Sequence, residues 1–114
     1  MKKSIIAALA LTFLATPASS QSFIGAERLF NACSQKEPSW HDGFCTGFVI
    51  AIADTMETTA LHGWSACIPT DATVGHLQQI VSVWLKNNEQ DHKYSANSIV
   101  AEALSKAYPC GTIN

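Results

Sequence analysis

Cysteine has the widest range of chemistry of the residue types in this chain, and the chain contains four of them. Thiols can bind zinc, exchange disulfides, attack a substrate or form structural bridges. A zinc site would favour close pairs such as Cys-x2-Cys, and a redox pair would use Cys-x-x-Cys; the chain contains neither spacing. A nucleophilic cysteine would leave an odd thiol in an even set. The sequence therefore predicts two structural disulfides.

Histidines and carboxylates are scattered along the chain. The four histidines are His41, His62, His76 and His92. No two of them are four residues apart, so no His-Glu-x-x-His type of zinc site is present. We interpret them as surface residues, with a pH-sensing role as the alternative. Asp54 and Glu57 are one helical turn apart and are interpreted as a solvated stripe. The chain has no nucleophile elbow and no phosphate-binding loop, so we predict no catalytic, cofactor or metal site and no enzyme.

The N-terminal residues 1–20 have the pattern of a secretory signal peptide. Lys2 and Lys3 precede an apolar run at residues 5–14, and small residues follow up to Ser20. An uncleaved anchor is less favoured, because about 20 apolar residues are needed to span a bilayer. We therefore expect residues 21–114 to form one domain in the periplasm, where disulfides persist.

The charge balance excludes some partners. The chain has seven Lys and Arg against nine Asp and Glu, and loss of Lys2 and Lys3 would leave a net charge near −4. Without a basic patch, neither nucleic acid nor anionic lipid is an expected partner.

Helical periodicity dominates the remaining sequence, and no useful strand-like alternation occurs. Four helices are expected, at about residues 22–33, 45–61, 73–85 and 91–108. Ser22 and Thr73 are plausible N-caps, and Gly63 is expected to stop the second helix. That second helix begins with Cys45 and is apolar on most sides, so we expect the other helices to cover it on several sides.

The order of the helices predicts the disulfide pairing. In an up-and-down bundle, Cys33 and Cys45 lie at one end, whereas Cys67 and Cys110 lie at the other. A helix of about 16 residues is about 24 Å long, but a disulfide needs Cα atoms within about 7 Å. We therefore predict a small all-α four-helix bundle with the bridges Cys33–Cys45 and Cys67–Cys110.

The tryptophans leave two interpretations open. Trp84 belongs to the apolar stripe of the third helix and is expected in the core. Trp40 and Trp64 fall in expected loops, where each could pack over an end of the core or serve as an interface anchor.

The cysteines belong to an ordered set of motifs: Cys33, Cys45-x-Gly47-Phe48, Cys67-x-Pro69 with Thr73, Gln79-x4-Trp84-Leu85, His92-x3-Ala96 and Ala103-Leu104-x3-Tyr108-Pro109-Cys110. This set resembles the Rap/Tai family of periplasmic immunity proteins against type VI secretion amidase effectors. The chain departs from the pattern at Asn88, where a proline is expected, and at Ala51, where a glycine is expected. The resemblance implies a helical, disulfide-bonded and often dimeric protein without catalytic activity, which binds a peptidoglycan amidase and blocks its active-site cleft.

We expect the partner to bind the polar segment after the third helix together with the outer face of that helix. The predicted partner-binding residues are Gln78, Ser82, Asn87, Asn88, Glu89, Gln90, Asp91 and His92. An ordinary connection between helices is the alternative for the segment.

Two other functions compete with immunity. A periplasmic acid-stress chaperone similar to HdeA would also be small, helical and disulfide-bonded, although two disulfides would resist its unfolding at low pH. A small secreted hydrolase has almost no support from the residues.

Overall fold

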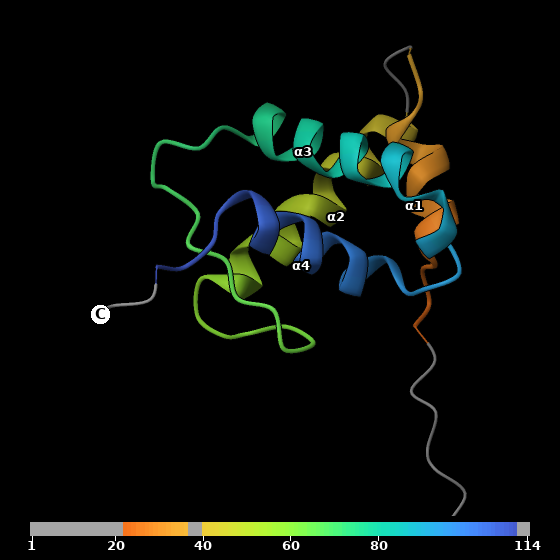
Figure 1. Ribbon diagram of the computed structural model, residues 1–114. Coiled ribbons are helices and arrows are strands. Elements are labelled where there is room, and N and C mark those ends of the chain that lie inside the picture. Colours follow the sequence, from red (N-terminus) through yellow and green to blue (C-terminus); the bar gives the residue numbers. More distant parts are fainter. Residues whose placement is uncertain (1–21, 37–39, 112–114) are drawn as a thin grey trace, which may run out of the picture.

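The computed structural model describes residues 22–36 and 40–111, so the predicted signal peptide lies outside the described residues. The described chain contains four α-helices and one 3₁₀ helix (Figure 1). The elements are α1 (Ala26–Cys33), α2 (Trp40–Met56), α3 (Val74–Asn87), η1 (Glu89–Asp91) and α4 (Ala96–Ala107). The predicted all-α bundle of four helices is confirmed.

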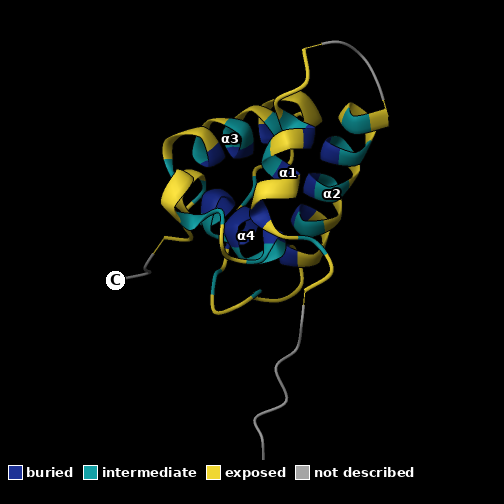
Figure 2. Ribbon diagram, turned by 90° about the vertical axis from the view of Figure 1, so that its right-hand side faces the viewer, coloured by how far each residue is buried: buried dark blue, intermediate teal, exposed yellow. Residues whose placement is uncertain are grey.

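The core lies between the four helices. Helix α1 is at one end of the molecule, where it lies between α2, α3 and α4 (Figure 2). Leu29, Val49, Leu85 and Leu104, one from each α-helix, are at most 1% exposed. Burial of an aliphatic side chain of this size contributes about 1.5–3 kcal/mol, so each helix contributes to the stability of the others.

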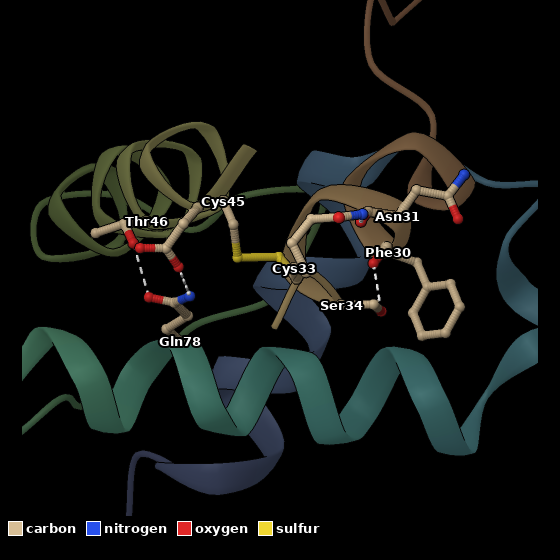
Figure 3. Close-up of a disulfide and its surroundings, with 9 residues drawn as sticks. Phe30, Asn31, Cys33, Ser34, Cys45, Thr46 and Gln78 are labelled. Carbon is tan, nitrogen blue, oxygen red and sulfur yellow. Dashed lines mark hydrogen bonds between the residues drawn. A yellow bond between two sulfur atoms is a disulfide. The ribbon is translucent and has the colours of Figure 1, made fainter. Parts of the chain in front are cut away.

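Both predicted disulfides are present. The Cα atoms of Cys33 and Cys45 lie 5.0 Å apart, and those of Cys67 and Cys110 lie 4.9 Å apart. The first bridge joins α1 to α2 (Figure 3). Beside the second bridge, the backbone N–H of Cys67 donates a hydrogen bond to the carbonyl oxygen of Tyr108. The loop after α2 is thereby fastened to the end of α4.

The predicted limits of α2 are wrong at both ends. The helix begins at Trp40, five residues before Cys45, and ends at Met56 rather than near residue 61. Its first turns include Trp40 and Phe44, whose ring centroids lie 6.4 Å apart. Aromatic pairs at this spacing stabilise a helix. Cys45 therefore lies in the second turn of α2 and not at its start.

Gly63 has a different role from the predicted helix stop. His62 and Gly63 both have positive φ, 51° and 81°, in a tight turn between Leu61 and Trp64. The backbone groups of Leu61 and Trp64 exchange two hydrogen bonds of 2.9 Å. Positive φ at both central residues is the geometry that favours glycine in such a turn.

Helices α1 and α4 begin four or five residues later than predicted, because the residues before them pair with each other. The N–H of Ala26 donates to the carbonyl of Tyr94, and the N–H of Ala96 donates to the carbonyl of Ile24. This antiparallel contact keeps both segments extended up to the first helical residue. Ser22 is consequently no N-cap, whereas the predicted cap of α3 is confirmed: Thr73 Oγ1 accepts from the N–H of His76.

Helix α2 has two apolar rows, and only one is buried. The buried row is Cys45, Val49, Ala53 and Met56. The second row, which we call the α2 aromatic row, is Trp40, Phe44, Phe48 and Ile52. Trp40 is 66% exposed and the other three members are half-buried. The expectation that α2 is covered on several sides therefore holds for the first row and only in part for the second, because Phe44, Phe48 and Ile52 pack against the core with one side and Trp40 is mostly exposed.

The tryptophans differ in their surroundings. Trp84 and Trp64 are half-buried and pack against the core, and the Lys106 ammonium lies 5.1 Å from the centroid of the Trp64 ring. Trp40 is helical and mostly exposed, not in a loop over the core.

Candidate protein-binding surface

Gln78 lies at the seam between α2 and α3 and not on the outer face of α3. Its Oε1 accepts a hydrogen bond of 2.7 Å from Thr46 Oγ1, and its Nε2 donates one of 3.1 Å to Asp42 Oδ1. Figure 3 shows this pair of contacts beside the Cys33–Cys45 bridge. The side-chain amide of Gln78 is thus hydrogen-bonded to α2, which leaves fewer of its hydrogen-bonding groups for a binding partner.

Further along α3, Val83 forms a ridge between two hollows. The first, which we call the Trp84 hollow, has a volume of about 570 Å³ and is lined by His76, Gln79, Ile80, Val83, Trp84, Asn87 and Asn88. The second, which we call the Phe30 hollow, has a volume of about 440 Å³ and is lined by Phe30, Cys33, Ser34, Ser82, Val83, Lys86 and Glu89. Both hollows border on Val83, which is 50% exposed.

The predicted residue Ser82 is half-buried and lines the Phe30 hollow. Asn87 is exposed at the end of α3 and lines the Trp84 hollow. The structure therefore places these two predicted residues on opposite sides of the Val83 ridge.

Two residues of the polar segment after α3 are tied to the fold. Asn88 Nδ2 donates a 2.7 Å hydrogen bond to the carbonyl of Trp84, which closes the C-terminal end of α3. The imidazole of His92 lies 2.7 Å from the carbonyl oxygen of Leu85, and its ring centroid lies 4.7 Å from that of Phe30. We conclude that Asn88 and His92 hold the segment in place.

The remaining residues of the segment differ in accessibility. Glu89 and Gln90 are exposed, whereas Asp91 is half-buried and its N–H donates to the carbonyl of Asn88. Together with Asn87, the two exposed residues form a polar tip next to the Val83 ridge. The tip is the exposed part of the predicted site, and the Val83 ridge beside it is an exposed addition that was not predicted.

Sequence reasoning missed Val83. The buried positions of α3 are Leu77, Val81 and Leu85, and Val83 is out of phase with them. An apolar residue on the polar side of an amphipathic helix is the signal that could have identified it. A single exposed valine is common on protein surfaces, so the two hollows beside it are needed to distinguish it.

Within residues 22–36 and 40–111, no group of three His, Cys, Asp or Glu side chains could hold a metal ion. The same residues include no helix that is long and apolar enough to cross a membrane.

The structure thus shows a small disulfide-bonded helical domain with an exposed apolar residue, Val83, and a polar tip beside it. A family model described as Rap1a immunity proteins matches residues 25–110, and the chain belongs to this family. The match confirms the family that the sequence motifs indicate, and it favours an immunity function over an acid-stress chaperone. Comparisons with the curated proteins and with the solved structures give no match.

Proposed function

We propose that this protein is a periplasmic immunity protein that binds a peptidoglycan amidase effector and occludes its active site. It acts by binding and not by catalysis. Membership of the Rap1a immunity proteins supports the general function, and the resemblance to immunity proteins of the Rap/Tai type supports the amidase as the target.

The observation that best supports a binding role is the Val83 ridge with the polar tip beside it. An interface needs an apolar anchor that loses its water, surrounded by polar groups that exclude solvent. Val83 is the half-exposed anchor, the two hollows receive side chains of the partner, and Asn87, Glu89 and Gln90 supply the polar rim.

The shape of this surface suits occlusion. The tip follows the last turn of α3, and Asn88 and His92 fix its backbone at both ends. A preordered segment loses little conformational entropy on entering a cleft, so more of the contact energy contributes to affinity.

The test combines binding with protection. The chain would be produced with amidase toxins encoded beside its gene, and complex formation would be measured with the purified proteins. Val83→Glu places a charge at the ridge and should weaken binding at least tenfold, equivalent to about 1.4 kcal/mol. Cells that export the toxin to the periplasm should lose protection in parallel.

Val74→Glu is the matched control, because Val74 is on the same helix, is 45% exposed and lines neither hollow. It should bind and protect like the unsubstituted protein. If no neighbouring amidase forms a complex, the amidase is not the target; if Val83→Glu binds as tightly as Val74→Glu, the ridge is not the site.

The resemblance also implies a dimer, and we include this state in the proposal. Sedimentation of the free protein and of its complex would give the stoichiometry. A monomer at every concentration tested would remove the dimer without affecting the proposed target.

A further inference from the structure

A groove of about 810 Å³ lies where the residues before α1 meet α2 and the start of α4. It is lined by Ser22, Phe23, Ile24, Gly25, Phe48, Ile52, His62, Lys93, Tyr94, Ser95 and Asn97. We call it the N-terminal groove. It shares no lining residue with the two hollows on α3, so it is a surface separate from the proposed immunity site.

Large apolar side chains surround this groove. Phe23 is 99% exposed and Tyr94 is 51% exposed, and both belong to the groove lining. Burial of an exposed phenylalanine side chain would contribute a favourable free energy of about 1.5–3 kcal/mol. Groups of exposed aromatic residues on a small protein mark interaction sites.

The apolar surface continues from the groove along α2. Phe48 and Ile52 line the groove and also belong to the α2 aromatic row, in which the Phe44 and Phe48 rings lie 6.0 Å apart. Trp40 is at the far end of the row and is 66% exposed. From Trp40 to Ile52 the row is about 18 Å long, because a helix rises about 1.5 Å per residue.

Two cationic side chains lie against aromatic rings of this surface. The Lys93 ammonium lies 5.3 Å from the ring centroid of Tyr94, and the Arg28 guanidinium lies 5.7 Å from that of Phe44. The groove lining contains no carboxylate, although acidic residues outnumber Lys and Arg in the chain, nine to seven. This surface therefore complements a partner with negative charge beside apolar side chains.

From this complementarity we infer that the N-terminal groove and the α2 aromatic row bind an acidic protein segment that carries large apolar side chains. An apolar side chain of the segment enters the groove, where it covers Phe23 and Phe48. Carboxylates beside it pair with Lys93 and Arg28, which the rings already hold at the surface.

Two other occupants fit this surface less well. A second copy in a two-fold arrangement would bring another Lys93 and Arg28 to a groove that has no carboxylate to pair with them. An anionic membrane presents headgroups rather than single apolar side chains, so it would leave the groove unfilled.

The experiment uses labelled peptides of about 12 residues, the length of the aromatic row, with phenylalanines four residues apart and glutamates between them. Binding would be followed by fluorescence anisotropy. We expect saturable binding that weakens at least tenfold in Phe23→Ser and in Lys93→Glu. The controls are Val74→Ser, which also replaces an exposed apolar residue with serine, and Lys36→Glu, which reverses an exposed charge; both lie outside the groove and should bind like the unsubstituted protein.

Because Phe23 and Lys93 are exposed, neither substitution should change the urea midpoint of unfolding, so a loss of binding would not reflect misfolding. The inference is overturned if a peptide with lysine in place of glutamate binds equally well, or if the two groove variants bind like the controls. Dimerisation or binding to anionic vesicles that Phe23→Ser abolishes would also overturn it, because the occupant would then be a second copy or a membrane.

Discussion

The imidazole Nε2 of His92 lies 2.7 Å from the carbonyl oxygen of Leu85, seven residues earlier in the chain. Because a carbonyl oxygen only accepts hydrogen bonds, Nε2 carries the hydrogen and donates it. Leu85 is in the last turns of α3 and His92 follows η1. The contact therefore folds the polar segment back against α3, and the Phe30 ring of α1 packs against the imidazole.

His92→Ala should lower the free energy of unfolding by about 2 kcal/mol. The substitution removes one hydrogen bond, at about 1 kcal/mol, and one aromatic contact, at about 0.5–1.5 kcal/mol. Urea unfolding followed by circular dichroism would measure the change. Gln90→Ala is the control in the same segment, because Gln90 is exposed, and it should change stability by less than about 0.5 kcal/mol. Equal stability of the two variants would show that His92 does not anchor the segment.

Gln78→Ala should lower the free energy of unfolding by about 1 kcal/mol, because it leaves Thr46 and Asp42 without their partner across the α2–α3 seam. Gln79→Ala removes the same side chain one position further along, where it is exposed, and should be nearly neutral. Chemical denaturation of the two variants in parallel checks this. A neutral Gln78→Ala would mean that the two hydrogen bonds add nothing beyond those that water offers.

The features that the sequence predicts well are those with a strong local or covalent cause. Thr73 caps α3 because its hydroxyl accepts a hydrogen bond from a free N–H of the first helical turn, that of His76. The order of the helices is enough to pair four cysteines correctly. The start of α2 could not be predicted in the same way. Trp40 is in a polar stretch, and only its contacts along the helix show that the helix includes it.

The starts of α1 and α4 depend on a contact that is distant in sequence. Gly25 and Ser95 form a bridge, and nothing near either residue indicates the other. The same limit applies to the site. The polarity of the segment after α3 identified it as a candidate site. The sequence does not show that His92 anchors this segment while Gln90 is exposed, because that difference depends on the positions of Phe30 and Leu85.

Removal of each disulfide should destabilise the protein by an amount that depends on the loop it closes. The bridges join residues 12 and 43 positions apart, for which the chain-entropy estimate is about 3 and about 4 kcal/mol. The double variant Cys67→Ala/Cys110→Ala should therefore unfold at a lower urea concentration than Cys33→Ala/Cys45→Ala. The reverse order would mean that packing around the buried Cys45 outweighs loop closure.

Leu85→Ala and Val83→Ala should separate folding from binding on one helix. Leu85 is fully buried, so its truncation should lower the free energy of unfolding by about 2–5 kcal/mol. Val83 is 50% exposed, and its truncation should cost less than about 0.5 kcal/mol.

The effects on partner binding should be reversed. Where enough Leu85→Ala protein is folded, its affinity should be close to that of the unsubstituted protein, because Leu85 is 0% exposed and lines neither hollow. Val83→Ala removes the apolar contact between the hollows and should raise the Kd several-fold, since truncation of an interface anchor costs about 1 kcal/mol or more. Calorimetric titration with the purified partner, at a temperature where both variants are folded, gives the two Kd values. A Val83→Ala protein that is stable and binds at full strength would move the binding site away from the ridge, whereas weak binding by folded Leu85→Ala would mean that the ridge depends on the core beneath it.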